Sequence, residues 1–304
     1  MMRKLGLYLC LAVLAAGCYD AGNKEDCVGL KCPNGFQWPE GGEIRVWSIR
    51  LPDGALITRY FGIFIEQQTP DVPLPEPILG VCDRDVTADQ GENTVYYDVG
   101  ESISFELGTG ETVEVPRLLP DPNVTECMPG TACADGVIDF YGRRHDVAYL
   151  LETFQEAGPQ PNFYNNFHNV RTAETMPLSD RLDNLFVGPS FRMLSPPQDD
   201  TATVTFKRGE DVVFAWENEQ TPNPDVVAAA AIVIVPDVAT QETACLSLND
   251  GNFTVPGETI DSLEYDTGIM LVGNGADEAI MTDDGRIFHK WGQFCNLIPW
   301  QRVD

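Results

Sequence analysis

Short apolar stretches separated by turn-forming residues run through most of the chain. Residues 43–51 alternate Ile44 and Val46 with charged positions, and residues 56–66 are β-branched or aromatic almost throughout. Both patterns are typical of β-strands. Further runs of this kind predict strands at residues 78–82, 95–99, 102–107, 112–115, 191–194, 203–206, 212–216, 226–235, 244–248, 253–255, 269–272, 279–282 and 286–291. The pattern therefore predicts a mainly β protein.

Two stretches have features typical of helices, so we expect one or two short helices. Within residues 146–158, apolar side chains recur at i, i+3, i+4 and i+7. An aspartate that can cap a helix begins this stretch, and a glycine that can terminate one ends it. Residues 179–186 are the second candidate.

The predicted strands group into two β-rich domains, one at residues 43–190 with long loops and one at residues 191–304. The second has closely spaced short strands, which are typical of a β-sandwich, and we expect an immunoglobulin-like arrangement. Trp216 precedes both Cys245 and Cys295, so the antibody order of cysteine, tryptophan and cysteine is not present.

The most apolar segment of the chain stands at its N-terminus. Met1-Met-Arg-Lys4 precedes an apolar run at residues 5–16, which ends at glycine and Cys18. A cationic start, a short apolar run and small residues after it are typical of an export signal. As a helix, the run is too short to cross a hydrocarbon core of about 30 Å. We therefore expect a signal peptide at residues 1–17 and a polar tether at residues 18–42.

The end of this segment, Leu14-Ala-Ala-Gly-Cys18, resembles the lipobox of bacterial lipoproteins. The resemblance implies cleavage before Cys18, a diacylglycerol on its sulfur and acylation of its new amine, which anchors the protein to a lipid bilayer. Tyr19, in place of aspartate, implies by the sorting rule of enteric bacteria the outer membrane of a Gram-negative bacterium. Under the alternative, an ordinary secretory signal is cut at the same bond and leaves Cys18 unmodified.

A second resemblance covers roughly residues 200–275. The run Val-Val-Phe-Ala-Trp216, the Ile/Val strand after it, Cys245 and the sequence NDGNFTVPG at residues 249–257 are similar to a domain of uncharacterised bacterial envelope lipoproteins. No known function comes with this resemblance.

The charge of the chain restricts its partners. The formal net charge is −28, and removing residues 1–17 deletes Arg3, Lys4 and no acid, which makes it more negative by two. Such a surface repels nucleic acid and anionic headgroups, so neither is expected as a partner. Hydrophobic residues at 43% and aromatic residues at 10% are ordinary for a folded chain, so the acidity does not indicate disorder.

Seven cysteines remain after the signal and the anchor are set aside. Export makes disulfides the expected state for them, and the candidates are Cys27, Cys32, Cys82, Cys127, Cys133, Cys245 and Cys295. The first pair and the Cys127/Cys133 pair are spaced to close small loops, and Cys245 could bond Cys295. Cys82 is then left over, or pairs with a tether cysteine. The sequence contains no paired histidines and no Cys-x₂-Cys motif, so it does not favour a zinc site instead.

Catalytic motifs are scarce in the sequence. His145, within Arg143-Arg-His-Asp146, could be an oriented base beside an anion clamp or a polar residue at a strand-to-helix junction. The sequence contains no Gly-x-Ser-x-Gly elbow and no phosphate-binding loop with lysine. We therefore expect no catalysis and no cofactor. A pocket in which His145 meets a carboxylate and a hydroxyl would favour an enzyme instead.

Acidic and aromatic loops suggest other ligands. Asp83-Arg-Asp85 with Asp89 partly matches a calcium loop, but the required glycine and glutamate are missing. The Asn-Asp-Gly at residues 249–251 and the Asp-Asp-Gly at residues 283–285 are sequences that tight turns need by themselves. The aromatic stretch of residues 163–168 could stack on a sugar ring or be buried against the body.

These observations together favour a membrane-anchored cell-envelope lipoprotein with a structural or adhesive binding role. Its expected partners are the lipid bilayer, through the acyl anchor, and an envelope protein or glycan. The alternative is an envelope module that binds a glycan or calcium. Fold class alone does not decide between them.

Overall fold

The computed structural model is mainly β, as the sequence predicts, with a single short helix among the residues that it describes. Those residues are 41–67, 82–84, 94–140, 143–156, 163–174, 181–197, 202–221, 229–236, 243–281 and 287–304. The signal peptide and nearly all of the tether therefore lie outside the described residues.

One large sheet contains most of the strands and runs in the order β12-β11-β5-β6-β10-β2-β1-β20-β19-β16-β17-β3. Two further strands join it at the side, β4 next to β2 and β14 next to β20. Its strands are β1 (Gly42–Arg50), β2 (Leu56–Gln67), β3 (Cys82–Arg84), β4 (Val95–Tyr96), β5 (Ser102–Glu106), β6 (Thr112–Leu118), β10 (Ala148–Gln155), β11 (Asn166–Thr172), β12 (Leu185–Val187), β14 (Val204–Lys207), β16 (Ala229–Pro236), β17 (Thr243–Leu248), β19 (Thr267–Met281) and β20 (Ile287–Val303).

Two small sheets of three strands each complete the described structure. The first is β13 (Phe191–Ser195), β15 (Val212–Asn218) and β18 (Asn252–Val255), in the order β13-β15-β18. The second is β7 (Thr131–Cys133), β8 (Gly136–Ile138) and β9 (Arg144–His145). The helix α1 (Gly257–Asp261) follows β18 and buries Ile260.

Strand β1 lies between β2, the next strand in the chain, and β20, the last described strand. It pairs antiparallel with β2 along its whole length and parallel with β20, with Gly42 opposite Phe288 and Arg50 opposite Asn296. One continuous sheet therefore includes strands from both sides of residue 190, where the sequence places a boundary between two domains. The immunoglobulin-like connectivity expected for residues 191–304 stays a prediction.

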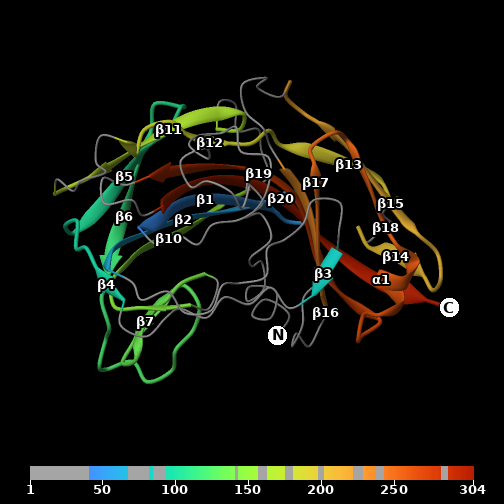
Figure 1. Cartoon of the computed structure of the whole chain (residues 1–304), viewed down its shortest axis with the longest axis horizontal. Coiled ribbons are helices and arrows are strands. Elements are labelled where there is room, and N and C mark those ends of the chain that lie inside the picture. Colours follow the sequence, from blue (N-terminus) through green and yellow to red (C-terminus); the bar gives the residue numbers. More distant parts are fainter. Residues whose placement is uncertain are drawn as a thin grey trace.

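The central strands separate two hydrophobic cores. Alternate residues of β1 face opposite sides, so that Ile44 and Val46 enter the first core while Trp47 and Ile49 enter the second. In Figure 1, β11 and β12 lie on one side of the central strands and β7 on the other. The first core extends under the β13-β15-β18 sheet, and the second lies on the side of the β7-β8-β9 sheet. Because both faces are buried, β1 is covered as completely as a strand in a doubly packed sheet.

The large sheet curls so that β12, at one end of the strand order, lies against β19 and β20. The close approach depends on Gly292, because a Cβ atom there would lie 1.8 Å from the backbone oxygen of Phe186. Nearby, the side-chain amide of Asn274 donates to the backbone oxygen of Pro189 at 2.7 Å. A glycine is therefore required where β12 crosses β20.

The helix predicted within residues 146–158 is wrong, because this segment forms β10. Its residues pair with β2 from Tyr149 to Gln155, and successive side chains alternate between the two cores, Tyr149 in the first and Leu150 in the second. A strand covered on both faces near its start carries apolar residues at adjacent positions, which reproduces helical spacing by chance. Strand pairing then overrides the local preference.

The second predicted helix is also wrong in the part that the structure describes. Residues 185 and 186 belong to β12, which pairs with β11. No pattern in the sequence predicts α1, whose single turn has no side-chain cap and is fixed by the burial of Ile260. No helix among the described residues is long and apolar enough to span a membrane.

Replacing Gly292 by alanine should lower the free energy of unfolding by at least about 3 kcal/mol, because the new methyl group meets backbone atoms that cannot rotate away. Gly275→Ala on β19 is the matched control. Its Cβ would meet the flexible side chain of Gln293 at 3.0 Å, so its effect should stay below about 1 kcal/mol. Urea unfolding of both variants checks this, and equal stabilities would contradict the close approach of β12.

Candidate functional site: a buried charge cluster

Charged side chains gather on the second-core side of β1. Glu43 and Arg45 stand two residues apart on this strand and therefore point to the same face. Asp139 and Arg143 come from the segment between β8 and β9, and His145 ends β9. These five residues, which we name the charge cluster, are all at most 9% exposed.

The loop between β8 and β9 is closed by its own aspartate. The backbone N–H of Asp139 donates to the backbone oxygen of Arg143 at 2.9 Å, and the N–H of Arg143 donates to the Asp139 carboxylate at 2.9 Å. The Nε of Arg143 donates to the same carboxylate at 2.7 Å. The aspartate thus fixes both the turn and the direction of the guanidinium group.

Glu43 connects this loop to the sheet. One of its oxygens accepts from Nη2 of Arg143, and the other accepts from Nε of Arg45 at 2.6 Å. Burial alone would raise the pKa of Glu43, but Arg143 and Arg45 outweigh it and lower that pKa below its usual value. Burial likewise acts to raise the pKa of Asp139, yet Arg143 and His145 lower it. Both carboxylates therefore stay ionised.

Aromatic rings cover the guanidinium groups. Arg45 lies 4.8 Å from the ring centre of Trp291, and Arg143 lies 5.5 Å from that of Phe61. A third buried arginine, Arg59, lies between Trp47 and Phe140 at 5.1 and 4.9 Å. Its Nε donates to Glu152 at 2.7 Å. Cation–π contacts of this kind are stronger when water is excluded, so they help to compensate for the desolvation of the arginines.

His145 links the charge cluster to Tyr96 on β4. Its Nε2 lies 2.9 Å from the Asp139 carboxylate, and its Nδ1 lies 3.2 Å from the hydroxyl of Tyr96. Because ionised Asp139 can only accept a hydrogen bond, Nε2 of His145 carries the proton and is the hydrogen-bond donor. Burial and then Asp146 raise the pKa of Tyr96 above its usual value. The phenol therefore stays protonated and does not provide a nucleophile.

An enzyme would be favoured if His145 met a carboxylate and a hydroxyl in a pocket. The structure provides both, but the hydroxyl is a phenol with a raised pKa and the imidazole is only 1% exposed. The arrangement orients and holds the imidazole between two partners. Chemically, it is suited to fixing the β7-β8-β9 sheet on β1 and less suited to activating a substrate.

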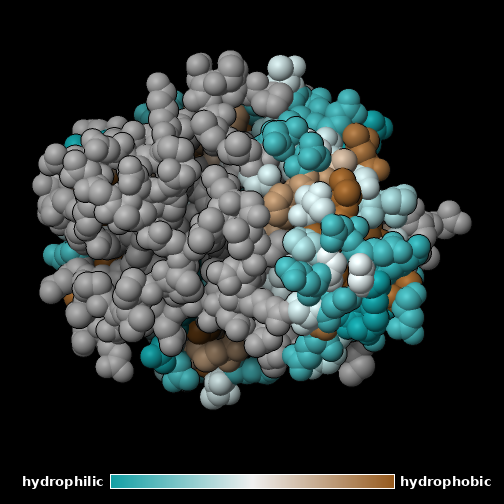
Figure 2. All heavy atoms as spheres, turned by 45° about the vertical axis from the view of Figure 1, so that its right-hand side comes forward, coloured by the Kyte–Doolittle hydropathy of each residue, from teal (hydrophilic) through white to brown (hydrophobic). Residues whose placement is uncertain are grey.

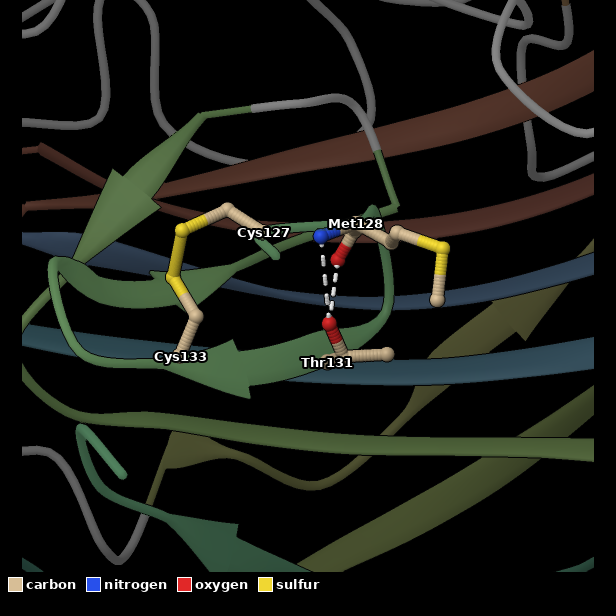
Figure 3. Close-up of a disulfide and its surroundings, with 4 residues drawn as sticks. All are labelled: Cys127, Met128, Thr131 and Cys133. Carbon is tan, nitrogen blue, oxygen red and sulfur yellow. Dashed lines mark hydrogen bonds between the residues drawn. A yellow bond between two sulfur atoms is a disulfide. The ribbon is translucent and has the colours of Figure 1, made fainter. Parts of the chain in front are cut away.

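The β7-β8-β9 sheet carries the disulfide predicted between Cys127 and Cys133, and this prediction is confirmed (Figure 3). The Cα atoms of the two cysteines are 5.2 Å apart. Inside the loop, the Thr131 hydroxyl donates to the backbone oxygen of Met128 at 2.6 Å. The disulfide and this turn together constrain a loop that is otherwise largely exposed.

A disulfide between Cys245 and Cys295 was a wrong prediction. Cys295 has a free, buried thiol, whereas Cys245 is disulfide-bonded. The two lie in different cores, on opposite faces of the large sheet, so their side chains cannot meet. The backbone of Cys82 on β3 lies directly opposite Cys245. Cys18, Cys27 and Cys32 lie outside the described residues.

The Cys295 thiol packs inside the second core instead. The indole N–H of Trp47 donates to its sulfur at 3.0 Å. Burial raises the pKa of the thiol to about 12, so it stays protonated and unreactive at neutral pH.

The other two histidines have structural surroundings. His168 accepts from the backbone N–H of Gly108 at 3.0 Å and lies 3.0 Å, through Nε2, from the backbone oxygen of Phe163. Burial lowers the pKa of His168 to about 4. His289 is buried and stacks on Trp291 at 5.2 Å. Both are parts of packed cores.

The aromatic stretch at residues 163–168 lies largely inside the protein. Phe163 and Tyr164 are 3% and 7% exposed, and their rings contact each other at 5.1 Å. Of the two interpretations of this stretch, burial against the body is the one that the packing favours. Glycan binding elsewhere on the surface stays a prediction.

The acidic turns give no metal site in the described part of the chain. No group of three or more His, Cys, Asp or Glu side chains there is arranged to hold an ion. The side-chain oxygen of Asn249 accepts from the indole of Trp216 at 2.7 Å, and Gly251 has a φ of 99°, as a structural turn requires. Asp85, Asp89 and residues 283–285 lie outside the described residues.

Sequence reasoning missed Glu43, Asp139 and Tyr96, and it gave Arg45 no role. One signal was available. Glu43 and Arg45 share a face of a strand whose other residues are mostly apolar, and a buried strand tolerates charges only as matched pairs. Their partner Arg143 comes from far along the chain, so spacing could not identify it.

No family model, no curated protein and no solved structure matches this chain.

Replacing Glu43 by glutamine should lower the free energy of unfolding by about 3 kcal/mol, because it leaves two buried arginines short of a negative charge. Glu217→Gln is the control, since its ion pair with Arg192 is largely exposed, and it should change stability by less than about 0.5 kcal/mol. Chemical denaturation measures both. A Glu43 variant as stable as the control would refute the buried network.

His168 should make stability depend on pH. Its pKa is about 4 in the folded protein against 6.5 in the unfolded chain, because burial disfavours the charged form. Its contribution is therefore complete above about pH 6.5 and is lost as the pH falls toward 4, by about 3 kcal/mol at most. Unfolding measured across this range should show a steeper decline for the wild type than for His168→Gln. Parallel curves would exclude this role.

Proposed function

We propose that the protein is a cell-envelope lipoprotein, anchored through lipidated Cys18 in the outer membrane of a Gram-negative bacterium, with a structural or adhesive binding role and no catalysis. The observation that carries the proposal is the combination of the Leu14-Ala-Ala-Gly-Cys18 sequence with an oxidised disulfide, Cys127–Cys133, in the folded body. Disulfides persist in exported proteins and are rare in the reducing cytosol.

The charge cluster supports the binding role over catalysis. Its carboxylates and guanidinium groups are matched to one another, and its imidazole ends at a protonated phenol. Groups that are satisfied in this way stabilise a structure, whereas a catalytic site needs groups that can exchange partners with a substrate. The cluster holds a disulfide-constrained loop on the sheet, which suits a protein that presents a rigid surface.

Lipidation is tested by labelling a bacterium that expresses the protein with palmitate. Wild-type protein should carry the label and sediment with membranes, and Cys18→Ala should lose both properties because no sulfur remains to accept diacylglycerol. Cys10→Ala, which changes the other cysteine of the signal, is the control and should stay labelled. An intact mass that corresponds to a mature chain with free Cys18 would overturn the anchor.

A further inference from the structure

The second half of β10 has a strand neighbour on one side only. Tyr149 to Gln155 pair with β2, but the pairing with β6 includes just Ala148 and Tyr149. From Leu150 to Gln155, the hydrogen bonds of the described residues provide no neighbour on the outer side. In the described part of the chain, this stretch is therefore an open edge inside the strand order of the large sheet.

Pro116 explains why β6 leaves β10. It comes immediately before Arg117, which pairs with Tyr149. Because β6 and β10 are antiparallel, Pro116 would stand opposite Leu150. Proline has no N–H to donate across a ladder. Pro116 instead lies opposite Ser102 of β5, and β5 and β6 turn away from the central strands together (Figure 1).

The open edge is accessible to a partner. Glu152, Thr153, Phe154 and Gln155 are all exposed, and Phe154, at 65%, is the most exposed large hydrophobic side chain in the described part of the chain. By comparison, the face that includes β13, β15 and β18 is mainly hydrophilic with scattered hydrophobic residues (Figure 2). No lysine, proline or bulge interrupts β10, although such features commonly protect exposed edges.

The backbone of this edge offers hydrogen bonds. In an antiparallel ladder, alternate residues direct their N–H and C=O groups to opposite sides. Half of the residues from Leu150 to Gln155 therefore present both groups outward. An extended segment that lies alongside β10 would form backbone hydrogen bonds with these N–H and C=O groups, as in strand addition to other sheets.

Acidic residues lie at the free end of this edge. Asp53, in the turn between β1 and β2, lies near the end of β10 that pairs with Leu56, and Glu156 follows the strand. Two cations on the neighbouring strands are already paired, Arg59 of β2 with Glu152 and Arg117 of β6 with Asp98. A second copy of this chain, with a formal charge of −28, would be repelled, whereas a cationic segment would be attracted.

We propose that β10 binds an extended, cationic segment of a partner protein, which adds to the sheet along Leu150–Gln155 and packs an apolar side chain on Phe154. The inference deepens the proposed function, since it names the surface through which a binding lipoprotein would act. It does not depend on the acyl anchor, so the two can fail separately.

The test uses the full-length protein in detergent and a fluorescent octapeptide of alternating lysine, valine and threonine. Hydrogen exchange should show slower exchange at alternate amides between Leu150 and Glu156 when the peptide is bound. Anisotropy should show that Phe154→Lys weakens binding at least about tenfold, because it removes the apolar contact and adds a like charge. Val124→Lys is the matched control, since Val124 is 37% exposed but lies in the loop between β6 and β7, outside any strand. It should leave affinity within about twofold.

Three results would overturn the proposal. The first is no binding, or binding without the alternating protection. The second is equal binding of a peptide of the same charge in which prolines replace two valines, which would indicate charge adsorption alone. The third is a dimer of the protein that Phe154→Lys dissociates, which would assign this edge to a second copy. Circular dichroism of both variants confirms that each is folded.

Discussion

The parallel pairing of β1 with β20 is the constraint on which the rest of the structure depends. It places the first described strand in the middle of the large sheet, where both of its faces are buried. Glu43 and Arg45 lie on one of these faces, and a buried charge without a partner destabilises a fold strongly. The position of β1 therefore requires a partner for Glu43 besides its neighbour on the strand, and the loop after β8 supplies Arg143.

This requirement connects regions that the sequence separates. Arg143 is held by Asp139, Asp139 by His145, and His145 by Tyr96, so one chain of contacts extends from the centre of the sheet to β4. Val137 of β8 and Phe140 of the loop after it pack in the second core. The β7-β8-β9 sheet is too small to be stable alone. Its disulfide constrains the exposed end, and the charge cluster fixes the buried end.

Much of the local structure could be predicted from the sequence, and the long-range structure could not. Alternation and turn residues located β1, β2 and the hairpin of β5 and β6 because these signals act between near neighbours. The spacing of Cys127 and Cys133 gave their disulfide for the same reason. β10 was misread as a helix, and Cys295 as a disulfide cysteine, because each depends on which face of a distant strand it meets. The charge cluster belongs to this second group.

The pairing of β1 with β20 also has a kinetic meaning. β1, the first described strand, cannot reach its final hydrogen-bonded position until its partner β20 (Ile287–Val303) is available. A fold built on contacts so distant in sequence forms slowly, because chain entropy is lost before those contacts are gained. Export, as proposed for this protein, would require the chain to remain unfolded until it has crossed the membrane. A slow-forming fold of this kind is compatible with that requirement.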